Sequence, residues 1–195
     1  MVERESPLGA AFRPGRHGNL SAGPGLRISE VTPPGIAEAA AWPGMKAALA
    51  EVISSVTTLS LSAKPNTGDV GPESSAFSIG PQHFLVTGEA DLPARLAAAV
   101  PLEFGTVTDR SHGRTAIRVD GPRAGWVLAK LFAIDFHAEA FPVTEGRATA
   151  HHDIFARIQR VRPDGFDIYV FRSFARAFWL GLCEAAEEVG YEVVD

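Results

Sequence analysis

Short segments in which apolar and polar residues alternate are separated by longer segments with helical periodicity. Leu26–Val31 alternates and predicts a strand, whereas Pro43–Ile53 places its apolar side chains on one side of a helix. Val56–Leu61 predicts a further strand, and the Gly- and Pro-containing stretch Lys64–Ser74 predicts a loop. After residue 25, the chain is therefore expected to run through a strand, a helix and a strand before its first long loop.

A hairpin and a helix are predicted to follow this loop. Ala76–Ile79 and His83–Val86 have strand patterns and are separated by a turn that contains Gly80 and Pro81. Leu92–Val100 has a helical pattern, and Asp91 precedes it as the predicted N-cap, with Pro93 in the first turn. Apart from the strand predicted over Val56–Leu61, the first part of the sequence thus has the order strand, helix, strand, strand, helix.

The second part of the sequence repeats this order of elements. A strand, a helix, a hairpin around the turn RPDG and a long final helix follow one another, with Gly190 ending the last helix and Ser173 as its predicted N-cap. The predicted segments are Arg114–Val119, Pro122–Phe132, Ile154–Val161, Phe166–Phe171 and Ser173–Val189.

The repeated order predicts an α+β fold made of two related strand-helix-strand-strand-helix halves with antiparallel sheets. We expect an extended N-terminal arm over residues 1–25 and a single α+β domain over residues 26–195. The two halves of that domain are predicted to cover about 26–106 and 107–195.

The arm contains many Gly and Pro residues and no sustained periodicity. Ser6–Gly25 nevertheless carries the apolar residues Leu8, Phe12 and Leu20. Two interpretations stay open: the arm lies along a surface, its own or a partner's, or it is a disordered terminus.

Composition narrows the class of protein. Of the 195 residues, 46% are apolar and 21% are charged, and the net charge is −5. An acidic balance argues against general nucleic-acid binding. The charged start MVERESPLG does not resemble a signal peptide, and no apolar stretch is long enough to span a bilayer. We expect a cytoplasmic protein without nucleic-acid or membrane partners.

Few residue patterns in the chain indicate catalysis or ligand binding. Ser111 and His112 are neighbours, and adjacent side chains in an extended chain point to opposite sides, so they are poor evidence for a catalytic pair. Gly121-Pro122 lacks the glycine-rich pattern of a phosphate loop. His151 and Asp153 supply two potential metal ligands, too few for a site. The residues alone therefore predict no catalytic, cofactor-binding or metal-binding residue, and Cys183 is expected to be an inert core residue.

Three stretches in the second half nevertheless resemble a known family. TDRSHGRTAIRVDGPRAGWVLAK, IDFHAEAFP and FDIYVFRSFARAFWLGL occur in the order and spacing of the gamma subunit of heterotetrameric sarcosine oxidase, and SPL near the N-terminus fits the same family. The resemblance is firmest between Val107 and Leu182. It implies the fold of the folate-binding region of the glycine cleavage T-protein, to which this family is related.

The resemblance also implies partners and a reaction. In the family, alpha, beta and delta subunits join the gamma subunit, and the complex oxidises sarcosine with oxygen to glycine and hydrogen peroxide. The methyl carbon passes to tetrahydrofolate as the 5,10-methylene derivative or leaves as formaldehyde. FAD, FMN, NAD and tetrahydrofolate are expected on partner subunits, and no cofactor is expected on this chain.

A second hypothesis is a free-standing folate-binding or aminomethyltransferase-like protein. The stretch EGRATAHHDIFARI corresponds to the hairpin that carries paired aspartates in T-proteins, but it contains only Asp153. We therefore carry no folate-binding aspartate over to it. Asp135 matches a recurrent aspartate of the family, and its role there can be structural.

Directional polar groups in two places predict a subunit interface. A polar segment joins the two halves, and two arginines flank the start of the last helix. For these two arginines, carboxylate partners on another chain and simple solvation both stay open. An interface needs only donors held in a fixed loop, whereas catalysis needs groups that converge on one point. The predicted interface residues are Asp109, Arg110, Ser111, His112, Arg114, Arg172 and Arg176.

Overall fold

Two sheets form the framework of the protein, one in each of two units. The computed structural model describes residues 5–195. The first unit consists of the N-terminal segment up to Thr32 together with His112–Val143 and Thr149–Asp195. The second unit consists of Pro33–Ser111 and Thr144–Ala148. Residues 26–32, which we placed in the first predicted half, thus belong with the C-terminal segments, because their strand pairs there.

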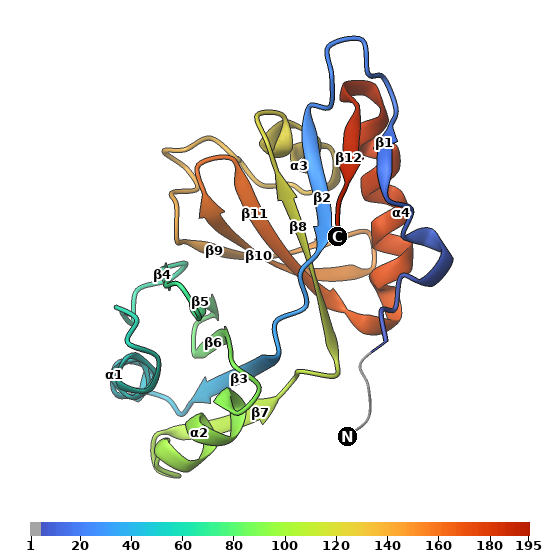
Figure 1. Cartoon of the computed structure of the whole chain (residues 1–195). Coiled ribbons are helices and arrows are strands. Elements are labelled where there is room, and N and C mark those ends of the chain that lie inside the picture. The colour runs from blue at the N-terminus through green and yellow to red at the C-terminus, as the bar shows by residue number, and fades with distance from the viewer. Residues whose placement is uncertain (1–4) are drawn as a thin grey trace. The chain divides into compact units, whose positions relative to one another are not determined.

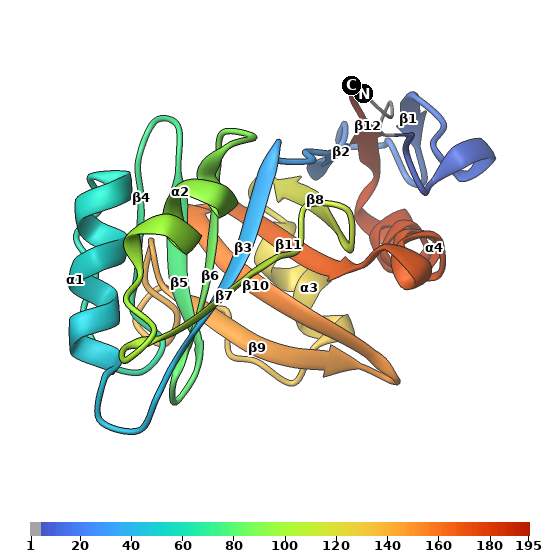
Figure 2. The same ribbon diagram turned by 90° about the horizontal axis from the view of Figure 1, so that it is seen from below.

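The second unit is a five-stranded antiparallel sheet with two helices (Figure 2). Its strand order is β4-β5-β6-β3-β7. The elements are β3 (Gly35–Ala41), α1 (Lys46–Thr57), β4 (Gly68–Val70), β5 (Ser75–Gly80), β6 (His83–Gly88), α2 (Leu92–Ala99) and β7 (Gly105–Asp109).

A seven-stranded sheet has the order β1-β12-β2-β8-β11-β10-β9 and belongs to the first unit, except for residues 146–148 of β9, which are grouped with the second unit (Figure 1). Its β12–β2 pair is parallel. The elements are η1 (Gly9–Ala11), β1 (Gly15–His17), β2 (Leu26–Glu30), β8 (Arg114–Asp120), α3 (Ala124–Leu131), β9 (Gly146–His151), β10 (Ile154–Arg162), β11 (Gly165–Phe171), η2 (Arg172–Phe174), α4 (Ala175–Ala186), η3 (Glu187–Val189) and β12 (Tyr191–Val193).

The predicted internal repeat is present, and the α+β class with antiparallel sheets is confirmed. The order β3-α1-β4-β5-β6-α2-β7 is repeated as β8-α3-β9-β10-β11-α4-β12. The sheets repeat too, because β4-β5-β6-β3 corresponds to β9-β10-β11-β8. The main difference is β2, which lies between β8 and β12 in the first unit, whereas β3 and β7 pair directly in the second.

Each unit buries one face of its sheet under its own helices. In the second unit, Leu49 and Ile53 of α1 and Leu96 of α2 form one cluster with Phe84 and Val86 of β6. These side chains are all fully or almost fully buried. The helical and alternating patterns therefore meet on a common apolar face, which is the main source of stability expected for such a unit.

In the first unit, the long helix α4 supplies the largest buried side chains. Phe178, Trp179 and Leu182 face the sheet and pack with Ile117 of β8 and Ile168 of β11 in one cluster. Phe178 and Leu182 are one turn apart and Trp179 follows Phe178, so the three side chains share one side of the helix. Substitution of such residues by alanine leaves a cavity that costs about 3–5 kcal/mol for the aromatic ones.

The arm is ordered and belongs to the first unit. Leu8 is fully buried in the core cluster, and the Phe12 ring lies 5.5 Å from that of Trp179 between centroids. The Trp179 Nε1–H donates a hydrogen bond of 3.1 Å to the carbonyl of Ala11. The arm thus lies along the surface of its own unit, which was one of the two interpretations left open.

Val56–Leu61 does not form the predicted strand, and this prediction is wrong. Helix α1 continues to Thr57, whose hydroxyl donates a hydrogen bond of 2.7 Å to the carbonyl of Ile53. Thr58 then ends the helix with a positive φ of 60°. The β-branched residues that indicated a strand instead extend the helix, which shows that tertiary packing can override their preference.

The predicted helix caps also differ from the structure. Asp91 occupies the N-cap position of α2, but its side chain makes no capping hydrogen bond and instead lies 3.6 Å from Arg95. Ser173 is not the N-cap of α4, because a 3-10 turn over Arg172–Phe174 precedes the helix. Both helices begin near the predicted positions without the side-chain caps that we expected.

Within the described part of the chain, every helix is too short or too polar to cross a lipid bilayer.

The burial of Leu8 predicts that the arm contributes to the stability of the first unit. Substitution Leu8→Ala should lower the free energy of unfolding by about 2–5 kcal/mol, because it removes a fully buried side chain from the core. Chemical denaturation of the full chain measures this change. Leu20→Ala is the matched control, since that side chain is 40% exposed. Equal losses for the two variants would contradict the role of Leu8 as an anchor.

Candidate functional site

The polar segment over residues 109–114, here called the crossover segment, carries the chain from the second unit into the first. In the second unit, the Asp109 carboxylate accepts hydrogen bonds from the Ser111 amide at 2.8 Å and hydroxyl at 2.6 Å. The Ser111 hydroxyl in turn accepts a hydrogen bond of 3.0 Å from the Ile36 amide. Arg110 pairs with Glu38 at 3.2 Å. These bonds fix the turn at the end of β7.

On the other side of the unit boundary, the crossover segment is held to the end of β11. The Arg114 guanidinium lies 4.1 Å from the centre of the Phe171 ring, and the residue is only 3% exposed. The Arg172 amide donates a hydrogen bond of 3.0 Å to the carbonyl of Gly113. The Arg172 side chain hydrogen-bonds the carbonyl of Glu5, so the arm and the segment meet at this arginine.

The seven predicted interface residues therefore differ in their surroundings. Asp109, Arg110 and Ser111 hydrogen-bond within the second unit, and Arg114 and Arg172 have contacts within the first. His112 and Arg176 are exposed. The proposal that the segment presents arginine and histidine to a neighbour thus applies to Arg110 and His112, which are exposed, and not to Arg114, which is buried.

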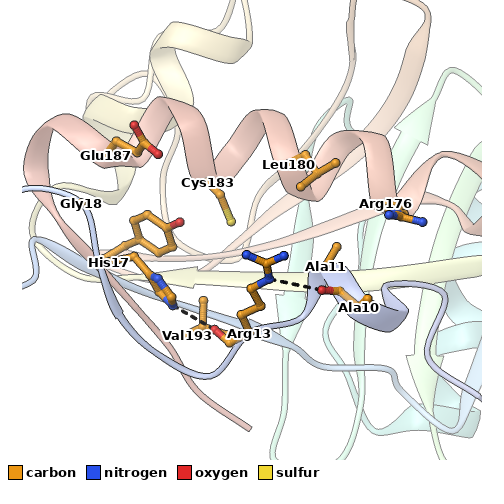
Figure 3. A pocket seen from close by; sticks show the side chains of 11 residues that line it. Ala10, Ala11, Arg13, His17, Gly18, Arg176, Leu180, Cys183, Glu187 and Val193 are labelled. Carbon is orange, nitrogen blue, oxygen red and sulfur yellow. Dashed lines mark hydrogen bonds between the residues drawn. The ribbon is translucent and has the colours of Figure 1, made fainter.

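Arg176 lines a cavity that the sequence did not indicate (Figure 3). This cavity, here called the arm–helix cavity, lies in the first unit between the arm and α4 and has a volume of about 420 Å³. Its lining residues come from the arm, from α4 with η3, and from β12, and they are Ala10, Ala11, Arg13, His17, Gly18, Arg176, Leu180, Cys183, Glu187, Tyr191 and Val193.

The arm residues of this cavity are held in place by ring stacking and hydrogen bonds. The His17 ring stacks on the Tyr191 ring with 5.2 Å between centroids. Its Nε2 lies 2.9 Å from the carbonyl oxygen of Arg13. A close backbone approach fixes the same part of the arm, because a Cβ on Gly18 would lie 2.6 Å from the carbonyl oxygen of Glu187. Gly18 has a φ of 74°, which favours glycine.

The thiol and the phenol in the cavity are held in their neutral forms. Burial raises the pKa of the Cys183 thiol, the Glu187 carboxylate raises it further, and a hydrogen bond with Tyr191 opposes this shift. Burial also raises the pKa of the Tyr191 hydroxyl, to which Cys183 and Glu187 add. Near neutral pH these two groups therefore act as hydrogen-bonding groups without charge.

The histidine pair lies at a sheet edge. His151 ends β9, the outermost strand on that side of the sheet, and its Nδ1 lies 2.9 Å from the carbonyl oxygen of Leu131. His152 turns the chain with a φ of 50°, and both His152 and Asp153 are exposed. Over residues 5–195, no three His, Cys, Asp or Glu side chains gather in a way that could hold a metal ion.

Sequence reasoning missed Arg13, His17 and Tyr191 as lining residues of one cavity. These residues meet because β1 pairs with β12, so that His17 lies opposite Tyr191 across more than 170 positions. Each of the two strands has three residues, too few to show a periodic pattern. Only the apolar residues of the arm indicated that it would be bound to a folded surface.

Comparison with known proteins gives one family and several relatives. The GCVT N-terminal domain family matches residues 63–194. The sarcosine oxidase subunit gamma of Corynebacterium sp. strain P-1 is 32% identical over 118 residues, which cover 60% of this chain and 58% of the relative. The corresponding subunit of an Arthrobacter species is 37% identical over 73 residues, or 36% of each chain. In sequence, the chain therefore spans at most about six tenths of these curated relatives.

Similarity in structure extends further along the chain. A chain of the heterotetrameric sarcosine oxidase from Corynebacterium sp. U-96 aligns with a TM-score of 0.80 and 24% identity, covering 95% of this chain and 96% of that one. The glycine cleavage system aminomethyltransferase T from Bartonella henselae aligns with a TM-score of 0.59 and 16% identity, covering 88% of this chain and 48% of that one. These structures share the fold, and the resemblance stated from the sequence motifs is confirmed.

The raised pKa of Cys183 predicts slow alkylation of the folded chain. The thiolate is the reactive form, so a raised pKa lowers its fraction at pH 8. The rate of reaction with iodoacetamide should keep rising as the pH passes the ordinary value of a thiol. The denatured chain, which contains the same single cysteine, is the control and should show the ordinary midpoint.

The variant Tyr191→Phe gives a second measurement for this prediction. It removes the hydrogen bond that lowers the Cys183 pKa, so the midpoint of the rate profile should move further up. A midpoint at or below that of the denatured chain would contradict a half-buried thiol that is neutral near pH 7.

Proposed function

Because the chain belongs to the GCVT N-terminal domain family, we propose that it is a non-catalytic gamma subunit of a heterotetrameric sarcosine oxidase. The observation that carries this proposal is the match to the Corynebacterium complex, which covers 95% of this chain and 96% of the matched chain. The aminomethyltransferase match covers only 48% of that longer protein. The structural match thus extends over nearly all of the oxidase chain but over only about half of the T-protein.

The proposed reaction belongs to the whole complex. The alpha, beta and delta subunits would join this chain in the cytoplasm, and the complex would oxidise sarcosine to glycine with release of hydrogen peroxide. The methyl carbon would leave as formaldehyde or pass to tetrahydrofolate. Following the family resemblance, we place FAD, FMN, NAD and tetrahydrofolate on the partner subunits. For FAD and NAD, the lack of a dinucleotide fingerprint in this sequence agrees with that placement.

The residues of this chain do not fit the folate site of a T-protein. The β9–β10 hairpin offers one carboxylate, Asp153, which is exposed in a two-residue turn. Asp135 uses a carboxylate oxygen to accept a hydrogen bond of 2.8 Å from the His137 amide, so its side chain has a structural role in the following turn. We therefore assign no folate contact to either residue.

Co-purification tests the subunit proposal. A tagged copy of this chain, expressed from its native locus, should retain three further proteins, and the assembled sample should oxidise sarcosine and show a flavin spectrum. The isolated chain should show neither property, since the electron-accepting cofactors are placed on its partners. Peroxide production by the isolated chain in the presence of sarcosine would contradict the proposal. Tight tetrahydrofolate binding by the isolated chain would favour the free-standing alternative.

Two substitutions in the crossover segment separate assembly from folding. His112→Ala should weaken subunit association while changing the free energy of unfolding by no more than about 0.5 kcal/mol, because His112 is exposed. Arg114→Ala should lower that free energy by about 1–3 kcal/mol, because it removes a buried guanidinium stacked on Phe171.

Sedimentation of the coexpressed complex measures association, and denaturation of the isolated variants measures stability. Complexes that do form with His112→Ala should keep their turnover per assembled enzyme. Normal assembly of His112→Ala together with lost turnover would reject the interface role of the segment and assign it to catalysis.

A further inference from the structure

We propose that the arm–helix cavity binds the carboxylate group of a ligand, with Arg13 and Arg176 as the groups that hold it. No sequence pattern indicates such a site, and the proposed subunit function does not assign one. Its ligand is either a small organic acid or an Asp or Glu side chain of a neighbouring subunit. Both sources present the same chemistry to the two arginines.

The two guanidinium groups are available for an anion. Arg13 makes one long hydrogen bond, 3.4 Å from its Nε to the carbonyl oxygen of Ala10. Among residues 5–195, no carboxylate pairs with Arg13 or with Arg176, whereas Arg16 on the same arm pairs with Glu192 at 3.3 Å. A guanidinium presents a planar fork of donors that fits a carboxylate, and charge-assisted hydrogen bonds of this kind are the strong ones.

The one carboxylate in the cavity lies at its far end. Glu187 follows Arg176 by eleven residues on the same face of α4 and η3, which corresponds to about 16 Å along a helix. Figure 3 shows Arg13 between these two residues, with its guanidinium directed toward α4. The cavity is thus cationic near Arg13 and Arg176, and it is anionic only beyond Cys183, near Glu187. A ligand carboxylate should therefore bind at the arginine end of the cavity.

The walls between the charged groups favour an apolar body on the ligand. Leu180 on α4, Val193 on β12, and Ala10 and Ala11 on the arm contribute aliphatic surface. The neutral thiol of Cys183 adds a soft, polarisable surface without charge near neutral pH. We therefore expect a carboxylate with a longer aliphatic chain, such as butyrate, to bind better than acetate, because it removes more apolar surface from water.

Nuclear magnetic resonance titration of the full chain tests the small-molecule source. Sodium butyrate should give saturable shifts of amides in the arm and in α4, with a dissociation constant of about 1 mM for so small a ligand. Butyramide has nearly the same shape without the charge and should give none. Arg13→Gln and Arg176→Gln should each weaken butyrate binding by about tenfold, the loss of one charge-assisted pair.

Arg16→Gln is the matched control, since it removes the same charge from the same arm but from a residue that does not line the cavity. It should leave butyrate binding unchanged. Arg13 and Arg176 are exposed, so their substitution is expected to leave the free energy of unfolding within about 0.5 kcal/mol.

Assembly tests the neighbouring-subunit source and rests on the proposed function. If a partner's carboxylate occupies the cavity, the double variant Arg13→Gln, Arg176→Gln should associate with the partner subunits at least about tenfold more weakly, and Arg16→Gln should not. If the unsubstituted chain fails to join any partner, the proposed function is wrong. The butyrate titration alone then tests whether the cavity binds a carboxylate.

Saturable butyrate binding that depends on both arginines supports the site with a small acid as ligand. Weakened assembly of the double variant without butyrate binding supports it with a partner's side chain. The proposal is overturned if butyrate does not bind and the double variant either assembles normally or has no partner to join.

Discussion

The first unit depends on β12, which pairs with β1 on one side and with β2 on the other. Tyr191 lies opposite Leu26 on one side and His17 on the other, so one short strand joins two separate parts of the arm to the sheet. Strands of three residues gain little from their own hydrogen bonds, and the stability must come from the cluster beneath them. Leu26, Tyr191 and Val193 all belong to that cluster, together with Leu8. The order of the arm, the position of α4 and the arm–helix cavity all follow from this arrangement.

Local patterns predicted the elements with the clearest sequence periodicity. The predicted bounds of β8, β10, β11 and α4 agree with the structure to within a few residues, although β8 and β11 are buried on both faces along most of their length. Gly35–Ala41 was missed, because alanines line both faces of β3 and produce no alternation. β3 lies between β6 and β7, which explains why small side chains suffice there.

The candidate site was predictable only in part. Asp109, Arg110 and Ser111 were recognised as polar residues in a turn, but their bonds to Ile36 and Glu38 depend on the pairing of β7 with β3. The burial of Arg114 could not be predicted, because no local pattern shows that Phe171 pairs opposite it. Arg176 was singled out for its place on the helix, whereas its relation to Arg13 depends on the course of the arm, which no local pattern reveals.

The division into units has a consequence for biosynthesis. Nearly all of the second unit is a continuous insertion, residues 33–111, between the first strands of the other unit and its remaining segments. This insertion contains the five strands and two helices of its own sheet and can begin to fold while the ribosome is still translating the C-terminal segments. The sheet around β12 cannot close until residue 193 has left the exit tunnel. Until β12 emerges, the edge of β2 that pairs with it is exposed, and an unpaired strand edge of this kind is prone to aggregate.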